Sequence, residues 1–114
     1  MRERIRDKER LLHITESIDF ILQNTIDTNY ETFTTNKLLY GAVVYYTMVI
    51  GEACYKLTNE FKQKHPNTPW NDITSMRHHL VHGYYQVDSR VLWEIISNDL
   101  PLLKTQIKQY LNEF

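Results

Sequence analysis

The residues best suited to chemistry are concentrated between Arg77 and Tyr85. This stretch holds one arginine, three of the chain's five histidines and two tyrosines. A histidine of near-neutral pKa can take the proton of a ribose 2′-hydroxyl or give one to the leaving oxygen. A guanidinium can hold the phosphate and stabilise its growing charge, so RNA cleavage by this route needs no metal. On composition alone, however, an arginine–histidine cluster at a helix end is more often structural or solvated.

A metal site is the competing interpretation of the histidines. His78 and His82 are four residues apart, so on a continuous helix they share one face, as metal-binding pairs do. The zincin pattern requires a glutamate directly after the first histidine, and that place is taken by His79. The sequence offers no obvious third ligand close by, and we therefore expect no metal and no other cofactor.

Arg77 and His82 form the pair that metal-free cleavage would use. Five residues along an ideal helix separate two side chains by about 140°, so the pair does not share a face. Two arrangements remove this difficulty. The helix can end near Gly83, which releases His82 from helical geometry, or the pair can work together with its copy across a two-fold axis.

The composition indicates what must position this segment. The chain has 114 residues, with 42% hydrophobic and 24% charged residues, which fits one globular domain covering 1–114. Three glycines and three prolines are few for a β-rich protein, so we predict an all-α fold. The net charge of −1 means that any polyanion must be held by a local patch. A single cysteine, Cys54, and the absence of a signal-peptide pattern favour the cytoplasm.

Apolar periodicity predicts an up-and-down bundle of four to five helices. The threonine-rich stretch 30–35 is predicted to be a loop in which Thr34 or Thr35 caps the next helix. The expected helices cover 2–26, 38–61, 68–82, a segment capped by Asp88, and a last segment that starts after a break at Asn98 or Asp99.

Several residues of the second helix carry separate expectations. The run from Tyr40 to Tyr55 is apolar but shorter than the roughly 20 residues of a membrane span, and is expected to be a buried helix. Gly41 and Gly51 suggest the close approach of another backbone, from this chain or from a dimer mate. Glu52 is expected to pair with a cation rather than to act in catalysis.

Other aromatic and ionisable residues are expected to be structural. Trp70 and Trp93 are interpreted as anchors of the core or of an interface. His13 and His65 are interpreted as surface residues. The charged residues 2–10 are interpreted as a solvated helix start in preference to a nucleic-acid-binding arm.

The sequence resembles the HepT-like toxins of the HEPN ribonuclease superfamily. Arg77, His82 and Tyr84 match the Arg-x4-His-x-Tyr motif of these proteins. The resemblance covers roughly residues 5 to 112. It includes an Ile-Gly-Glu-Ala helix at residues 50–53, a His-Pro-x-x-Pro-Trp turn at 65–70, and the C-terminal stretches Val87-Asp88, Val91-x-Trp93 and Asp99-Leu100-Pro101-x-Leu103.

The resemblance implies a homodimeric, metal-independent RNA endonuclease that acts as the toxin of a toxin–antitoxin pair. Arg77 and His82 would be catalytic, and the two copies of the motif would line one cleft. The implied antitoxin is an MntA-like nucleotidyltransferase that silences the toxin by transferring AMP to Tyr84, with assembly beyond the dimer as a further option. His78 stands where the superfamily commonly has asparagine or aspartate, and both His78 and His79 are candidates for contact with the substrate.

The alternative from another class is a non-catalytic module. In that case the chain is a helical protein that binds a nucleotide or docks its partner without cleaving RNA, because a shared fold does not establish an activity. The presence of Arg77, His82 and Tyr84 favours the ribonuclease.

Overall fold

The computed structural model describes residues 2–76, 81–82 and 86–114, and within them the architecture is all-α, as predicted. The three long helices are α1 (Arg2–Thr25), α3 (Lys37–Lys56) and α8 (Leu100–Leu111). The shorter elements are α2 (Tyr30–Thr35), α4 (Asn59–Lys64), α5 (Trp70–Thr74), the strands β1 (Val81–His82) and β2 (Gln86–Val87), α7 (Ser89–Glu94) and the π-helix η1 (Ile95–Asp99).

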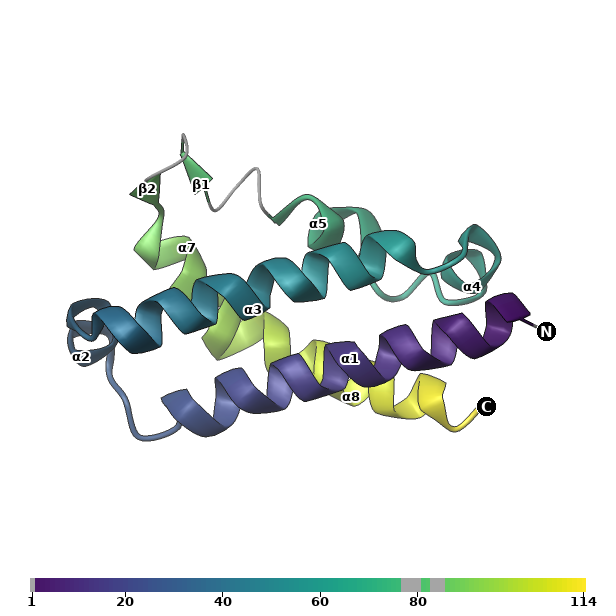
Figure 1. The fold of residues 1–114 in the computed structure, drawn as a ribbon, viewed down its shortest axis with the longest axis horizontal. Helices are drawn as coiled ribbons and strands as arrows, with labels where there is room; N and C mark the ends of the chain where they lie inside the picture. The colour runs from purple at the N-terminus through teal and green to yellow at the C-terminus, as the bar shows by residue number, and fades with distance from the viewer. Residues whose placement is uncertain (1, 77–80, 83–85) are drawn as a thin grey trace.

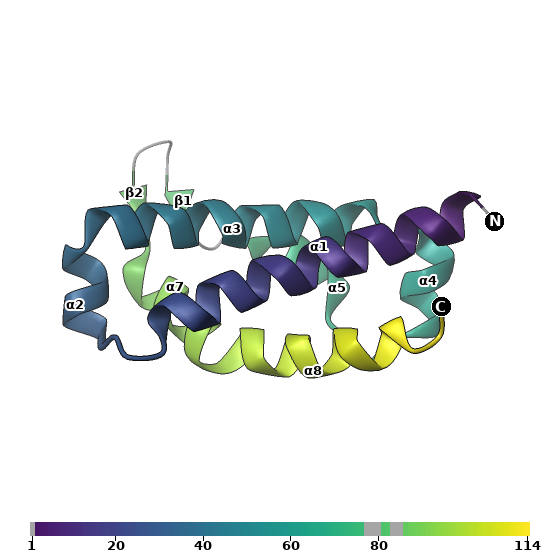
Figure 2. The ribbon, with the colours of Figure 1, turned by 60° about the horizontal axis from the view of Figure 1, so that its bottom comes forward.

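The long helices form an elongated bundle in which α1 packs against both α3 and α8 (Figures 1 and 2). Helix α1 runs antiparallel to its two neighbours, and α2 joins it to α3 at one end. The two termini lie together at the other end, beside α4. There the guanidinium of Arg4 lies 5.1 Å from the centroid of the Phe114 ring.

The apolar stripe of α1 supplies much of the core, as its three- and four-residue spacing predicts. Leu11, Ile14, Ile18 and Ile21 are fully buried, and Leu22 packs at their edge. Helix α1 ends at Thr25, before the predicted break at residues 27–29. The other buried apolar side chains are Phe33, Val43, Ile50, Cys54, Leu57, Phe61, Trp70, Ile73, Leu92, Ile95, Ile96, Leu100, Leu103, Ile107 and Tyr110.

The prediction of a loop at 30–35 was wrong, because these residues form α2. The side chain of Asn29 caps the helix by accepting a hydrogen bond from the N–H of Thr32 at 2.8 Å. Phe33 is fully buried and anchors this short helix in the core. The predicted cap at Thr34 or Thr35 was wrong as well, since Asn36 caps α3.

The single helix predicted over 38–61 is two helices. Leu57 has an extended backbone, and Thr58 caps α4 through its hydroxyl, which accepts from the N–H of Phe61 at 3.2 Å. The buried carboxylate of Asp7 fixes this break, because it accepts from the N–H of Thr58 at 3.0 Å and from its hydroxyl at 2.7 Å. Helix α4 ends before Pro66, as predicted.

The helix predicted over 68–82 is also interrupted, because α5 covers only Trp70–Thr74 and Val81–His82 form a strand. Pro69 occupies the N-cap position expected for Thr68. The Thr68 hydroxyl is used elsewhere, in hydrogen bonds with the hydroxyl of Tyr110 at 2.5 Å and the side-chain oxygen of Gln106 at 2.9 Å.

Helices α7 and α8 are joined by η1 instead of being separated by the predicted break at Asn98 or Asp99. Asp88 caps α7 as expected, accepting from the N–H groups of Arg90 and Val91. At the other end of the π-helix the N–H of Leu100 bonds to the carbonyl of Ile95. Pro101 explains the irregularity, because a proline has no N–H to continue the regular α-helical pattern.

Helix α3 is buried on one face only, so the expectation of a buried helix holds for that face and not for the other. Val43, Thr47, Ile50, Gly51 and Cys54 are buried, but only 33% of the helix's most apolar stretch is enclosed. Helix α3 has 20 residues and is apolar enough to cross a membrane by length and composition, so the expectation that it is too short was wrong. It is the only one of the described helices with these properties. Core helices of soluble proteins can have the same length and apolar composition, so these properties are weak evidence for a membrane span.

Candidate functional site

The segment that carries the predicted chemistry is held at both ends by the bundle. On the N-terminal side it follows α5, and on the C-terminal side it runs into β2 and α7. Arg77, His78, His79 and Tyr84 lie outside the described residues, and of His82 the structure describes the backbone. The proposed roles of these residues therefore stay predictions, and the described residues define the frame around them.

The anchor before the segment is the packing of α5 against α3. A Cβ atom added to Gly51 would lie 3.3 Å from the carbonyl oxygen of Ile73, which confirms the predicted close approach of a second backbone at Gly51. Trp70 is buried and donates its indole N–H to the carbonyl of His65 at 2.9 Å. The backbone just ahead of Arg77 is thus fixed directly to the core.

His65 belongs to this structural frame, and its side chain is only 14% exposed, so the expectation of a surface residue was wrong. Its ring lies 4.0 Å from that of Tyr110 and 4.6 Å from that of Phe61. Its Nε2 atom lies 3.1 Å from a carboxylate oxygen of Glu113. This histidine is a packing residue that helps to close the end of the bundle.

The anchor after the segment is formed by α2 and α7. Val87 packs against the core, and Asp88 caps α7. The hydroxyl of Tyr30 lies 2.8 Å from that of Ser89, and the guanidinium of Arg90 lies 4.5 Å from the centroid of the Tyr30 ring.

A third element, α3, also reaches this anchor through Tyr40. Burial raises the pKa of Tyr40, and the nearby Tyr30 and Asp88 raise it further. A hydrogen bond with Ser89 lowers this pKa but does not cancel the increase. The phenol therefore stays neutral and can serve as a hydrogen-bond donor at the C-terminal end of the segment.

The short hairpin changes the geometric argument about the catalytic pair. β1 and β2 are antiparallel, with Val81 opposite Val87 and His82 opposite Gln86. Because His82 is in a strand, the angle of about 140° that an ideal helix would impose between it and Arg77 does not apply. The departure of His82 from the helix, one of the two arrangements considered from the sequence, is thus present in the backbone, and the other, a site shared across a two-fold axis, stays a prediction. The same finding removes the shared helical face that a His78–His82 metal pair would have required.

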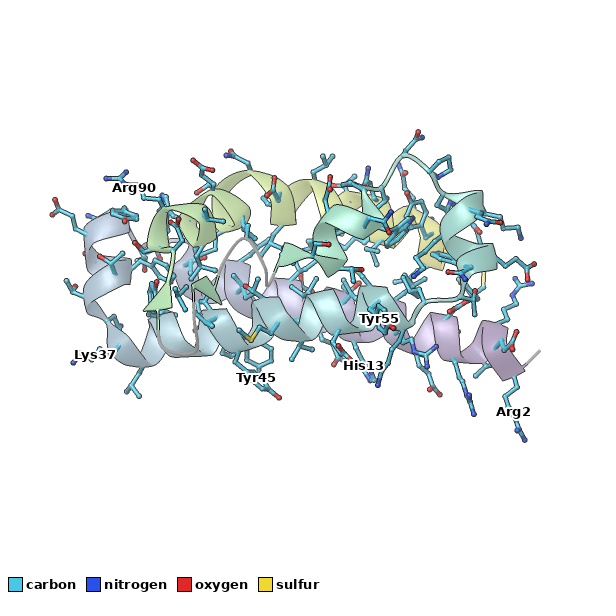
Figure 3. All side chains as sticks on the ribbon, turned by 90° about the horizontal axis from the view of Figure 1, so that it is seen from above. Arg2, His13, Lys37, Tyr45, Tyr55 and Arg90 are labelled. Carbon is cyan, nitrogen blue, oxygen red and sulfur yellow. The ribbon has the colours of Figure 1, made fainter. Side chains whose placement is uncertain are left out.

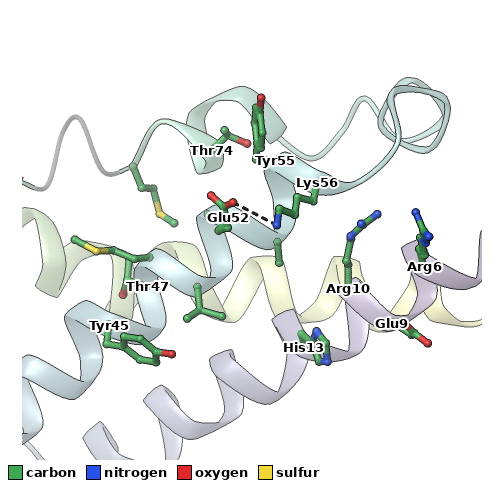
Figure 4. Close-up of a pocket in the computed structure, with 15 residues that line it drawn as sticks. Arg6, Glu9, Arg10, His13, Tyr45, Thr47, Glu52, Tyr55, Lys56 and Thr74 are labelled. Atoms are coloured by element: carbon green, nitrogen blue, oxygen red, sulfur yellow. Dashed lines mark ion pairs between the residues drawn. The ribbon is translucent and has the colours of Figure 1, made fainter. Parts of the chain in front are cut away.

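A groove of about 880 Å³ lies between α1 and α3 and reaches the start of the candidate segment (Figure 4). Thr74 and Met76 line it, directly before Arg77 in the sequence. The other lining residues are Arg6, Glu9, Arg10 and His13 from α1, and Tyr45, Thr47, Met48, Val49, Gly51, Glu52, Ala53, Tyr55 and Lys56 from α3.

The groove carries charges of both signs. Lys56 and Glu52 form an ion pair at 3.7 Å, which confirms the structural pairing expected for Glu52. Arg10 lies 4.0 Å from Asp7, an ion pair of the kind expected in the charged start of α1. Among the residues that the structure describes, no cluster of three histidine, cysteine or carboxylate side chains could hold a metal.

Two further expectations for isolated residues are confirmed. His13 is exposed, as expected, although it also lines the groove. Cys54 is fully buried, and this burial raises the pKa of its thiol to about 12, so it has no nucleophilic role at neutral pH. The tryptophan anchors are found as predicted, with Trp70 in the core and Trp93 packed against it.

Sequence reasoning missed the groove and its exposed aromatic residues. Tyr45 and Tyr55 are 62% and 63% exposed, although they belong to the most apolar stretch of the chain. For the tyrosines, though not for the groove, a signal was available in the helical spacing, since both lie on the side of α3 opposite to Val43 and Ile50.

Comparison with known proteins gives a consistent result. The family described as "Ribonuclease HepT-like" matches residues 14–110, a range that includes the whole candidate segment. A "Probable ribonuclease HepT" of Thermococcus cleftensis is 37% identical over 90% of this chain and 93% of its own length.

Two other relatives carry names of the same kind. A "Putative RNase" of Methanocaldococcus jannaschii is 35% identical over 89% of this chain and 93% of its own length. Another, of Caldanaerobacter subterraneus subsp. tengcongensis, is 35% identical over 90% and 92%. No solved structure matches the chain. The family match, together with relatives that align with this chain over nearly their whole length, shows that the chain belongs to the HepT-like ribonuclease family.

Proposed function

We propose that the protein is a metal-independent RNA endonuclease in which Arg77 and His82 form the catalytic pair. The observation that carries the proposal is the family match over residues 14–110, within which the sequence retains Arg77, His82 and Tyr84. The hairpin supports it, because a strand frees His82 from the helical spacing that would hold it away from Arg77. His78 and His79 are candidates for contact with the substrate phosphates.

The reaction uses the substrate's own 2′-hydroxyl as the nucleophile. Its oxygen attacks the adjacent phosphorus while the bond to the 5′-oxygen of the next nucleotide breaks, giving a 2′,3′-cyclic phosphate and a 5′-hydroxyl. His82 takes the 2′-hydroxyl proton or gives a proton to the leaving oxygen. Arg77 holds the phosphate and stabilises the negative charge that builds on it.

The active form in this proposal is a homodimer with both motifs in one cleft, and it acts as a toxin in the cytoplasm. Since the net charge is −1, affinity for RNA has to come from local cations that the two-fold symmetry doubles. Binding should weaken steeply with salt. It should strengthen below about pH 6.5, where unperturbed histidines become charged.

The cleavage test compares wild type, Arg77→Ala and His82→Ala on total RNA in EDTA. Loss of a general acid or base typically costs 10²–10⁴-fold in rate, so both variants should be about a hundredfold slower or worse. Lys108→Ala is the matched control, because it removes an exposed cation from α8 far along the chain from the motif. Equal cleavage by wild type and both variants, or no cleavage by any of them, would favour the non-catalytic docking module.

Regulation by an MntA-like nucleotidyltransferase is the second part of the proposal. AMP attached to Tyr84 would place negative charge and bulk beside Arg77, where the substrate phosphate has to bind. After co-expression with the antitoxin, intact-mass measurement should show mass added in steps of AMP and cleavage should be lost. Tyr84→Phe should remove the added mass, whereas Tyr85→Phe should retain it. Inhibition without added mass would point to blocking by protein–protein contact alone.

A further inference from the structure

We propose that the antitoxin docks in a groove between α5 and the start of α8, through a segment that carries one large apolar side chain flanked by lysine or arginine. The inference rests on the antitoxin of the proposed function and adds the surface of this chain that the antitoxin contacts. Residues from two sides line the groove, called the acidic groove below: Asp72, Ile73 and Met76 from α5 and just beyond it, and Asp99, Leu102 and Leu103 from the end of η1 and from α8.

The acidic groove lies apart from the exposed face of α3. Figures 2 and 3 show α5 between α3 and α8, and the acidic groove is on the α8 side of α5. In Figure 3, Tyr45 of α3 and Arg90 of α7 project from opposite edges of the molecule. Among the described residues, Met76 is the only one that lines both this groove and the one between α1 and α3. The acidic groove is therefore a separate surface of the protein.

The size and the lining of the acidic groove suit a single inserted side chain. Its volume is about 210 Å³, below the roughly 300–1,000 Å³ that pockets for small molecules occupy. Ile73 and Leu103 line it and are buried, whereas Leu102 is 61% exposed. An apolar hollow beside an exposed leucine can take an apolar side chain from a protein partner, and a few such anchors supply most of the binding energy of an interface.

The charges around the acidic groove are all of one sign. Asp72 and Asp99 line it and are exposed, and none of the described lining residues is basic. Burial raises the pKa of Asp99, and the nearby carboxylate of Glu94 raises it further. Within the described part of the chain, none of these three carboxylates forms an ion pair. Lysine or arginine beside the apolar anchor of a partner would offset the repulsion among them.

The same charges and the position of the acidic groove select the antitoxin as the occupant. Nucleic acid would be repelled by carboxylates, because its binding surfaces are basic. Met76 is the last described residue before the motif in the sequence, so a partner held there lies next to the chain that leads into the motif. In the proposed function the antitoxin is the protein that has to act on this motif. Asp99 is also the last residue of η1, and π-helical turns are frequent at functional sites.

The first test uses isothermal titration calorimetry to measure how tightly purified antitoxin binds variants of the acidic groove. Leu102→Arg should weaken binding by at least about tenfold, because it places a charge where the apolar anchor packs. The double variant Asp72→Lys/Asp99→Lys should weaken binding by a similar factor, because repulsion replaces attraction. The matched controls, Ile26→Arg and Glu16→Lys, make the same kinds of change at exposed positions that do not line the groove, and they should bind as wild type does.

The second test locates the contact without any variant. Hydrogen exchange of the wild-type chain should show added protection of the backbone at 69–76 and 99–106 when the antitoxin is bound. Protection confined to other parts of the chain would contradict the inference. Binding should also weaken as the salt concentration rises, because salt screens the attraction between exposed charges. Binding that does not change with salt would contradict the basic residues inferred for the antitoxin segment.

The outcomes separate this inference from the proposed ribonuclease. An antitoxin that does not bind wild type, or that binds Leu102→Arg and the double variant as tightly as wild type, overturns the docking surface. A molar mass of the chain alone that falls on Leu102→Arg, measured by light scattering, would identify a second copy as the occupant and overturn it too. Without antitoxin, the groove variants should cleave RNA at the wild-type rate. If wild type binds antitoxin through the acidic groove but cleaves no RNA, the docking surface is upheld while the catalytic proposal fails.

Discussion

The two faces of α3 show how one helix can satisfy different requirements. Its inner face packs against α1 and α5, with Ile50 and Cys54 fully buried and Gly51 in close contact with the backbone of Ile73. Its outer face exposes Tyr45 and Tyr55 and carries another glycine, Gly41, at which an added Cβ atom would meet nothing within 4 Å. The inner glycine is required by the chain's own fold, whereas the outer one has no such internal requirement. Substitutions of the two glycines should therefore differ in their effect on stability.

The largest expected effect concerns the inner face of α3, where the Cys54 thiol should react far more slowly in the folded protein than in the unfolded chain. It is fully buried and its pKa is raised to about 12, mainly by burial, against an ordinary value of 9.0. Labelling by a thiol reagent at neutral pH should be at least about a thousandfold slower in the native protein than in urea, because reaction must wait for the core to open. Fast labelling of the native protein would mean that the inner face is open to solvent.

The same shift gives a pH dependence. The unfolded chain loses the thiol proton above pH 9.0, whereas the folded chain retains it up to about pH 12. The contribution of this neutral thiol to stability is therefore complete below pH 9.0 and is lost as the pH rises towards 12. Urea unfolding of Cys54→Ala and wild type across this range should show a steeper alkaline loss in wild type.

Gly51→Leu should have the next largest effect, a loss of about 3 kcal/mol in the free energy of unfolding, at the upper end of the usual cost of overpacking. A Cβ atom at this position would already be 3.3 Å from a backbone carbonyl oxygen that cannot move aside cheaply. Urea denaturation followed by circular dichroism measures the change. Unchanged stability would show that α5 can shift away from α3.

Asp7→Ala should cost about 2 kcal/mol, since it removes a charged acceptor from two hydrogen bonds. Both bonds come from Thr58, the residue that separates α3 from α4. Asp7→Asn is the matched control, because an amide can still accept from the N–H of Thr58 and donate to its hydroxyl, so its loss should be smaller. Equal losses in the two variants would show that charge, and not hydrogen bonding, holds this junction.

The elements predicted correctly from the sequence are those whose cause is local. The stripe from Leu11 to Ile21 and the cap at Asp88 depend on residues within a few positions of each other. The break at Thr58 was missed because its cause, Asp7, is 51 positions away along the chain. Helix α2 was missed for a similar reason, since Phe33 is fixed by packing on Tyr40 and Trp93, with ring centroids 5.2 and 5.3 Å away.

The candidate site likewise has one part that can be identified from local sequence, the motif, and one part that cannot, the groove. The identities of Arg77, His82 and Tyr84 can be read from one short motif, which lies within the range of the family match, and their roles stay a prediction. The groove could not be predicted, because its walls come from α1 and α3 and their faces become neighbours only in the folded bundle. Periodicity identified the apolar side of each helix but not which part of it the chain itself would cover.

The smallest effect, and the one of opposite sign, is expected at the outer glycine. Gly41→Ala should stabilise the folded monomer by about 0.5–1 kcal/mol, because alanine is the better helix former and its methyl group meets nothing within 4 Å. Urea denaturation at protein concentrations low enough to keep the chain monomeric isolates this gain. Gly51→Ala is the comparison, since there the gain in helix propensity is opposed by the carbonyl of Ile73. If both alanine variants gave the same increase, the close packing at Gly51 would not distinguish the inner face of α3 from the outer one.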